Sequence, residues 1–214
     1  MRLFLALIAA LAAMVTAAPT LAQSAGIVRV RIVTSEGPIV VALDTRRAPK
    51  TSANFLAYVD DERFDGTSFY RAARRKTDPR YGFIQGGIST DARRILPPFS
   101  HEPTTRTGIS HLDATISMAR RSEADSAGGN FFLTVGATPN MDARGDYEGY
   151  AAFGRVVSGM ATVRRILALP TAGGSGAMKG QMIRRPVSII TARRLDGTPK
   201  PTGRPKPWLL GIRR

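Results

Sequence analysis

The sequence predicts a mainly β protein, a closed and mainly antiparallel β-barrel capped by two α-helices. Short runs of alternating apolar and polar residues recur along the chain, separated by turn residues and irregular loops. Only two stretches have the apolar spacing of a helix, and no internal repeat is present. Because many short strands must bury their apolar faces against one another, closure into a barrel is favoured.

The first two strands form an antiparallel hairpin. Residues 28–34 and 37–43 alternate in polarity, with Ser35-Glu-Gly37 at the turn. A helix follows, because Pro49 suits a first helical turn and residues 53–59 have helical apolar spacing. A second helix is predicted at 160–169, and further short strands at 68–72, 82–86, 115–119, 131–135, 150–156 and 187–192.

The N-terminus has the layout of a secretory signal peptide covering residues 1–22. Arg2 is followed by an uncharged apolar run at 3–15 and then by small residues up to Ala22. The apolar run is shorter than the roughly 18–20 residues that span a bilayer, so we expect cleavage rather than a membrane anchor. We therefore expect a periplasmic protein, with secretion as the alternative, and no stable membrane insertion after cleavage.

Cleavage leaves one domain, residues 23–195, and a C-terminal segment, residues 196–214. Four prolines alternate with basic residues between Pro199 and Pro207. This composition predicts an extended, flexible tail with a candidate apolar anchor at Trp208-Leu-Leu210, and a disordered end without function is the favoured alternative.

The chain is strongly basic, with 31 Lys and Arg against 16 Asp and Glu and a formal net charge of +15. Nucleic-acid binding is not expected, since neither a zinc-finger spacing nor an aromatic RNA-binding motif accompanies the charge. Binding of anionic lipid or polymer through the arginines stays open as an alternative function. The chain has no Cys and only 2 His, so we expect neither a disulfide nor a metal site. We expect a monomer without cofactor.

Two local patterns resemble known sites but lack essential parts. Ser110, His111 and Asp113 are residue types of a serine triad, but neighbours in sequence rarely form one, and no nucleophile elbow is present. Residues 173–180 are glycine-rich, yet Gly180 stands where a phosphate-binding loop requires Ser or Thr. We interpret this second segment as a flexible loop.

Five short motifs carry a stronger signal: Ser68-Phe-Tyr-Arg71, Gly82-Phe-Ile-Gln-Gly-Gly87, Ser117-Met-Ala119, Asn130-Phe-Phe132 and Ala152-Phe-Gly154. In this order they resemble the cyclophilin-type peptidyl-prolyl cis-trans isomerases, and the resemblance extends over residues 28–195. It implies an eight-stranded barrel and an enzyme that isomerises X–Pro bonds in unfolded or extended polypeptides without a cofactor. A proline-binding module without useful turnover is the alternative.

The chemistry of this reaction explains which residues matter. An X–Pro amide rotates slowly because resonance gives its C–N bond double-bond character, with a barrier of about 18–20 kcal/mol. In the twisted form the proline nitrogen gains a lone pair, which a fixed cation with N–H donors stabilises. The resemblance assigns this role to Arg71, orientation of the peptide and the arginine to Gln85, and the floor of the proline pocket to Phe132.

The resemblance also implies a set of substrate-binding residues, namely Phe83, Ala119, Asn130, Met141 and Tyr150. Strand alternation predicts that Phe131 faces the core while Phe132 faces the pocket.

The chain departs from the family between Arg71 and Gln85, where six residues are inserted. In consequence Gly82 falls where the family has an aromatic wall of the pocket. We expect Phe83 or Tyr81 to fill this place from a shifted backbone.

Two arginines occupy the rim of the expected site. Arg120 and Arg121 stand where the family has small or polar residues. Because like charges repel across an interface, they would favour acidic or phosphate-like clients over basic ones.

Overall fold

The computed structural model describes residues 25–209. Its strands are β1 (Ile27–Thr34), β2 (Gly37–Asp44), β3 (Thr67–Arg74), β4 (Gly82–Gly87), β5 (Thr115–Met118), β6 (Asn130–Val135), β7 (Ala152–Ser158), β8 (Thr171–Ala172) and β9 (Met182–Arg194). Its helices are α1 (Pro49–Asp60), α2 (Thr104–Thr107) and α3 (Met160–Ala168). The predicted strands and both predicted helices are therefore present, while β8 and the single turn of α2 are additional.

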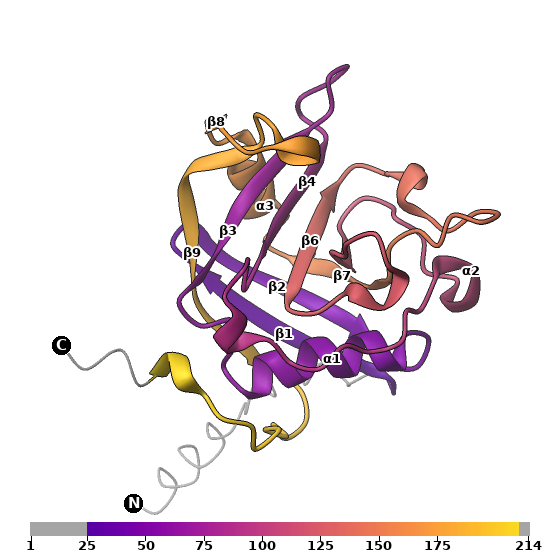
Figure 1. The fold of residues 1–214 in the computed structure, drawn as a ribbon, viewed down its shortest axis with the longest axis vertical. Helices are drawn as coiled ribbons and strands as arrows, with labels where there is room; N and C mark the ends of the chain where they lie inside the picture. Colours follow the sequence, from indigo (N-terminus) through magenta and orange to yellow (C-terminus); the bar gives the residue numbers. More distant parts are fainter. Residues whose placement is uncertain (1–24, 210–214) are drawn as a thin grey trace, which may run out of the picture.

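Eight of the strands close into an antiparallel barrel (Figure 1). They follow the order β1-β2-β7-β5-β6-β4-β3-β9, and pairing of β1 with β9 completes the circle. The two-residue β8 pairs with β9 outside this circle. The predicted closed eight-stranded barrel is confirmed.

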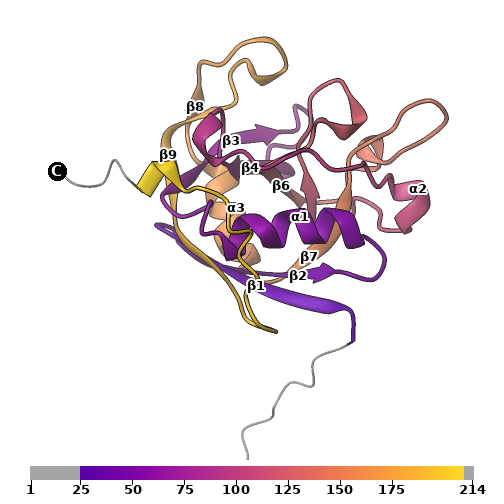
Figure 2. The same ribbon diagram turned by 60° about the horizontal axis from the view of Figure 1, so that its bottom comes forward.

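The helices cover the barrel and complete its core. α1 starts with Pro49 in its first turn and packs against β2 and β9, whereas α3 packs against β2, β3, β4 and β6. Figure 2, with the bottom of the molecule turned forward, shows α1 lying in front of the strands. The two predicted capping helices are α1 and α3.

Aromatic side chains form the centre of the core. The ring of Phe55 from α1 lies 5.1 Å from Phe64, 5.2 Å from Phe131 and 5.4 Å from Phe153, measured between centroids. These four rings and Phe69 are at most 1% exposed. Burial of such large rings is worth several kcal/mol each and holds the strands at a fixed register.

The C-terminal segment up to residue 209 packs on the barrel, which differs from the flexible tail that its composition predicted. The backbone N–H of Thr202 donates to Asp61 at 2.7 Å, and that of Lys200 donates to Asp60 at 2.8 Å. Trp208 is only 4% exposed and lies over the guanidinium of Arg63 at 4.7 Å. The segment is held because carboxylates near the end of α1 accept its N–H groups, contacts that no local pattern reveals.

The predicted signal peptide, residues 1–22, lies outside the described residues. Between residues 25 and 209, no helix is both long enough and apolar enough to cross a bilayer. The same part of the chain contains no group of three or more His, Cys, Asp or Glu side chains arranged to hold a metal ion.

Candidate active site

Side chains from four adjacent strands form a row across the outer face of the barrel. Arg71 in β3 pairs with Gln85 in β4, which in turn pairs with Phe132 in β6. Phe132 also pairs with Ser117 in β5. Because residues directly opposite each other in antiparallel strands share a face, the register of the barrel brings this row together. The row contains all three predicted catalytic residues, Arg71, Gln85 and Phe132.

A β-bulge at Tyr70 determines the direction of Arg71. In the pairing of β3 with β4, Phe69 lies opposite Gly86 and Arg71 lies opposite Gln85, so Tyr70 is an extra residue. Without it Phe69 and Arg71 would share a face, since side chains repeat every two positions. The bulge therefore lets Phe69 enter the core while Arg71 faces outward. A Cβ on Gly86 would lie 2.7 Å from the Phe69 ring, so a side chain there would displace that ring.

The residues between Arg71 and Gln85 form a long β3–β4 hairpin in which Arg71 and Gln85 are paired. Beyond Arg71 the strands stay paired as far as Arg74 and Gly82, so the extra length lies around the turn at 75–81. This hairpin projects from the top of the molecule in Figure 1. Arg71 Nη1 donates to Gln85 Oε1 at 2.8 Å, which preserves the contact between the two residues despite the insertion.

Neutral acceptors hold the guanidinium of Arg71. Besides Gln85, its Nε donates to Gln181 Oε1 at 2.9 Å and its Nη2 donates to the carbonyl of Ala177 at 3.2 Å. These three bonds use three of the five N–H groups of an arginine and leave one on each Nη atom. Sequence reasoning did not anticipate Gln181 or Ala177, which lie more than 100 positions along the chain from Arg71.

The positive charge of Arg71 is not neutralised by any carboxylate in the described part of the chain. Within residues 25–209, no Asp or Glu lies within ion-pair distance of it. The guanidinium lies over the ring of Phe83 at 4.9 Å, a favourable cation–π contact. Partial burial lowers the pKa of Arg71 from its usual value, but a guanidinium remains protonated at neutral pH. The site therefore presents a fixed cation with free donors.

A chain of hydrogen bonds fixes the amide of Gln85. Its Nε2 donates to the hydroxyl of Tyr70 at 2.8 Å, and that hydroxyl donates to Asn130 Oδ1 at 3.2 Å. Asn130 also exchanges two hydrogen bonds with the backbone of Ser89, at 2.8 and 2.9 Å. The side chain of Asn130, predicted to bind substrate, thus also fixes its neighbours. The second N–H of the Gln85 amide keeps no protein partner among the described residues.

Three rings surround Phe132 on the outer face. Phe83 lies 5.3 Å from it, Tyr150 lies 5.5 Å from it edge-on, and His111 lies 5.8 Å from it in a stacked arrangement. Phe131 instead contacts the core rings. The two rings thus lie on opposite faces of β6, with Phe131 in the core, as strand alternation predicts. Phe132 is 2% exposed, so the surrounding rings leave only a small part of it open to a ligand.

Phe83, rather than Tyr81, takes the place of the expected aromatic wall. Phe83 lies between Arg71 and Phe132, in contact with both. Tyr81 is 39% exposed and packs against Arg75 in the turn of the hairpin.

The remaining predicted residues lie around this centre. The carbonyl of Met141 accepts from the backbone N–H of Tyr150 at 3.0 Å within the loop between β6 and β7, which ties Met141 to the residue whose ring packs edge-on against Phe132. The backbone N–H of Ala119 donates to the carbonyl of Asn130 at 2.9 Å, and Ala119 lines a pocket together with Gln85 and Asn130. Ala119 and Met141 are both half-buried.

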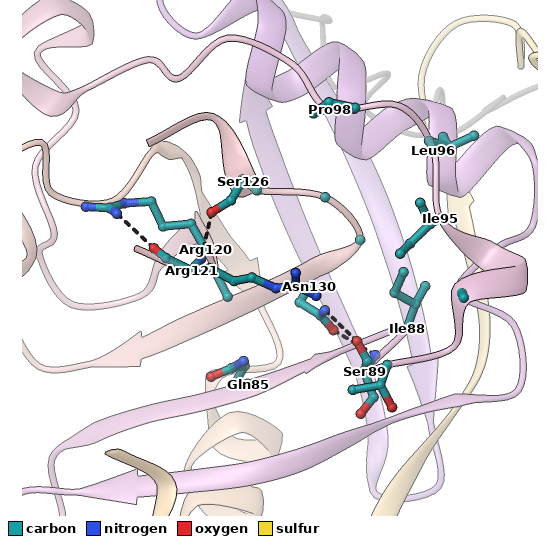
Figure 3. A pocket seen from close by; sticks show the side chains of 16 residues that line it. Gln85, Ile88, Ser89, Ile95, Leu96, Pro98, Arg120, Arg121, Ser126 and Asn130 are labelled. Carbon is teal, nitrogen blue, oxygen red and sulfur yellow. Dashed lines mark hydrogen bonds between the residues drawn. The ribbon is translucent and has the colours of Figure 1, made fainter. Parts of the chain in front are cut away.

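This pocket, of about 480 Å³, adjoins the row of catalytic residues (Figure 3). Gln85, Ala119 and Asn130 line the side nearest to the row. The opposite side is formed by the loop after β4 and by the loop between β5 and β6, and its lining includes Ile88, Ile95, Leu96, Pro98, Arg121 and Ser126. A ligand that reaches Phe132 thus has an open, largely apolar pocket beside it.

Comparison with known proteins agrees with the geometry. Residues 29–193 match the family model described as cyclophilin type peptidyl-prolyl cis-trans isomerase/CLD. Peptidyl-prolyl cis-trans isomerase A of Dickeya dadantii is 38% identical over 144 residues, covering 66% of this chain and 72% of that protein. Peptidyl-prolyl cis-trans isomerase cyp18 of Streptomyces antibioticus is 35% identical over 159 residues, covering 69% of this chain and 87% of that protein.

Solved structures show the same fold. A crystal structure of a cyclophilin-type peptidyl-prolyl cis-trans isomerase from Cryptosporidium parvum aligns with a TM-score of 0.62 and 21% identity, covering 80% of this chain and 99% of that one. A second crystal structure of that protein, in the presence of the dipeptide Ala-Pro, aligns with a TM-score of 0.63 and 22% identity, covering 79% and 99%. By its family match and its relatives, this chain belongs to the cyclophilin-type peptidyl-prolyl cis-trans isomerases, the enzymes that interconvert the cis and trans forms of X–Pro bonds.

Proposed function

We propose that this isomerase acts on X–Pro bonds of exported polypeptides in the periplasm, and that Arg71 is its central catalytic residue. One observation carries the assignment to Arg71. Its guanidinium lies over the ring of Phe83, which in turn contacts Phe132, and it is held by neutral acceptors among the described residues with an N–H left free on each Nη atom. A cation in this state can favour the developing lone pair on a proline nitrogen.

The client chain lies extended across the outer face, with its proline ring against Phe132 and beside Phe83, Met141 and Tyr150. As the X–Pro amide twists, its nitrogen becomes pyramidal and accepts a hydrogen bond from Arg71. Because this interaction is strong only in the twisted form, it lowers the barrier instead of merely binding the client. The free N–H of Gln85 donates to a client carbonyl and keeps the bond beside Arg71.

A proline peptide as the ligand has independent support. The Cryptosporidium parvum relative was crystallised in the presence of Ala-Pro. The likeness in fold makes an equivalent ligand reasonable here. The monomeric state is likewise part of this proposal.

Arg71 is tested by cis-trans exchange of a short X–Pro peptide, measured by NMR with the wild-type protein, Arg71→Ala and Arg71→Lys. We expect acceleration by the wild type, nearly complete loss in Arg71→Ala, and poor recovery in Arg71→Lys, because a lysine lacks the fork of donors. Unchanged turnover in a folded Arg71→Ala protein would sink the assignment. Shifts of peptide resonances without acceleration by the wild type would instead support the alternative of a proline-binding module.

The periplasmic location rests on the signal-peptide layout of residues 1–22. The test is the intact mass of the protein recovered from a periplasmic fraction. We expect a chain that begins at Gln23. Recovery in the culture medium would favour secretion, and a chain that retains residues 1–22 would contradict cleavage.

A further inference from the structure

The pocket beside the catalytic row has a position that suits a second side chain of the same client. It shares Gln85, Ala119 and Asn130 with the site (Figure 3). In an extended chain, side chains two positions apart point to the same side and lie about 7 Å apart. A client whose proline rests on Phe132 therefore directs the side chain two residues away toward the same face, where this pocket opens.

The two arginines of the pocket lining have different roles. Arg120 is held through Nε by the carbonyl of Gly149 at 2.7 Å and through Nη1 by the carbonyl of Ser122 at 2.7 Å. It also lies over the ring of Tyr150 at 5.3 Å. These contacts direct its guanidinium away from the pocket and use it to brace the neighbouring loops.

Arg121 is the cation that remains available to a ligand. Its backbone N–H is fixed by Ser126 Oγ at 2.8 Å, while its side chain is exposed and has no hydrogen bond or ion pair with residues 25–209. Figure 3 shows this side chain extending over the pocket, on the side opposite to the guanidinium of Arg120. The backbone of Arg121 is thus fixed at the edge of the pocket, and its guanidinium is available to bind a ligand.

Among residues 25–209, no carboxylate lines the pocket to compete for Arg121. Asp91, in the loop after β4, pairs with Arg93 at 2.9 Å and with Arg94 at 3.3 Å. Asp125 accepts from the backbone N–H of His101 at 2.7 Å. Glu123 belongs to the same loop as Arg121 but not to the lining.

We infer that this pocket selects clients with an acidic side chain two residues from the proline, and that Arg121 is the specificity-determining residue. The inference rests on the proposed function, because it takes the client's proline to lie on Phe132. A carboxylate in the pocket gains an attraction to Arg121 while the stem of the client side chain packs on the apolar wall. A lysine at the same client position is repelled.

The test compares peptides that share one X–Pro core and carry Glu, Gln or Lys two residues before the proline, with a second set altered two residues after it. NMR yields both the exchange rate and the affinity for each peptide in the same titration. At one of the two positions we expect the wild type to prefer Glu over Gln by about two- to fivefold, the range of a solvent-exposed ion pair. We expect the preference to shrink when salt is raised from roughly 0.02 to 0.5 M.

Charge variants identify the residue responsible. Arg121→Gln should abolish the preference for Glu, and Arg121→Glu should reverse it in favour of Lys. Arg185→Gln, which removes an exposed arginine of β9 outside the pocket, should keep the wild-type preference.

The outcomes separate the two proposals. Equal rates and affinities for Glu, Gln and Lys at both positions would overturn the acidic preference while leaving isomerase activity intact. A preference for Glu that survives in Arg121→Gln would overturn the assignment to Arg121. Absence of acceleration for every peptide would count against the proposed mechanism, and the affinities would then still decide whether the pocket prefers an acidic side chain.

Discussion

The imidazole of His111 stacks on the ring of Phe132, with centroids 5.8 Å apart and planes 12° from parallel. Its Nδ1 lies 2.6 Å from Asp142 Oδ1, and its Nε2 lies 2.9 Å from Ser117 Oγ. The backbone of His111 is tied to the same loop, since its N–H donates to Asp142 and its carbonyl accepts from Thr138. The floor of the proline pocket therefore rests on a hydrogen-bonded histidine.

These are the residue types of a serine triad, but their burial gives them a different role. The side chains of His111 and Ser117 are at most 1% exposed, so the hydroxyl cannot reach a client carbonyl. With a neutral imidazole, Nδ1–H donates to Asp142 and Nε2 accepts from Ser117, which satisfies every polar atom of the ring. The arrangement packs the imidazole against one face of the Phe132 ring and anchors the loop that carries Met141.

His111 should make stability sensitive to mild acid. Burial lowers its pKa below that of an unfolded histidine, although the carboxylate of Asp142 acts in the opposite direction. The unfolded chain then binds more protons below about pH 6.5, so the free energy of unfolding falls as pH drops through that region. We expect His111→Gln to lack this component of the loss, as measured by urea unfolding at a series of pH values.

Asp142→Asn is the variant to compare with His111→Gln. It removes the charge that raises the pKa of His111, so the acid-dependent loss should persist and extend to lower pH. The carboxyl of Asp44, whose pKa is held below its usual value, titrates below this window and does not interfere. If His111→Gln and the wild type lost stability in parallel between about pH 6.5 and 5, His111 would not be the group responsible.

Alanine substitutions at the adjacent residues Phe131 and Phe132 test whether one face of β6 serves stability and the other serves peptide binding. Phe131→Ala removes a ring from the centre of the core and should cost about 3–5 kcal/mol in the free energy of unfolding. Phe132→Ala should cost less stability but weaken binding of a proline peptide at least tenfold, because the floor of the pocket is lost. Unfolding curves and NMR titrations on both variants measure the contrast. Unaltered peptide affinity in Phe132→Ala would place the proline pocket elsewhere.

Substitutions at Gln181 distinguish the contribution of the position of the Arg71 guanidinium from that of its charge. Gln181→Ala removes the acceptor at Arg71 Nε and should lower kcat a few-fold by loosening the guanidinium. Gln181→Glu keeps an acceptor there but adds a carboxylate, which should lower kcat by about tenfold or more because it neutralises the catalytic charge. Single-turnover exchange rates with both variants provide the measurement. Equal or higher activity in Gln181→Glu than in Gln181→Ala would show that positioning alone matters.

The sequence predicted the barrel and the central row of the site for identifiable reasons. Alternation along β6 was sufficient to divide Phe131 from Phe132, because a strand repeats every two residues whatever its partners are. The motifs that contain Arg71 and Gln85 were recognisable despite the insertion between them. The insertion only lengthens a hairpin, and pairing across a hairpin is local.

The parts of the site that sequence reasoning missed depend on contacts between distant segments. Gln181 reaches Arg71 only because β9 pairs with β3, and the bulge at Tyr70 is invisible in a pattern of apolar and polar residues. The carboxylate partner of His111 could not be found among its sequence neighbours, since Asp142 is 31 positions away. The signal available was a histidine shortly before a strand of the site, which alone does not identify a partner.

The C-terminal segment covers an ion pair that would otherwise face water. Arg63 Nε lies 2.8 Å from Asp61 Oδ2, and the two side chains are 2% and 0% exposed. Thr202 donates to Asp61, the carbonyl of Pro205 accepts from Arg63 at 3.3 Å, and the ring of Trp208 covers the guanidinium. These contacts make the segment part of the folded domain.

Removal of this segment should therefore lower the melting temperature, and Trp208→Ala should reproduce most of the effect. Loss of a buried indole costs about 3 kcal/mol, which corresponds to several degrees in a domain of this size. Leu209→Ala is the control, because that neighbouring side chain is 44% exposed and should change little. Truncation after Gly197 keeps the pair between Asp196 and Arg29, so any loss of stability comes from the packed segment alone.

Thermal unfolding followed by circular dichroism compares the three variants with the full-length protein. If the truncated protein melted with the full-length one, the segment would not be packed in solution. Turnover should be retained at temperatures where the truncated protein stays folded, since none of these contacts involves Arg71.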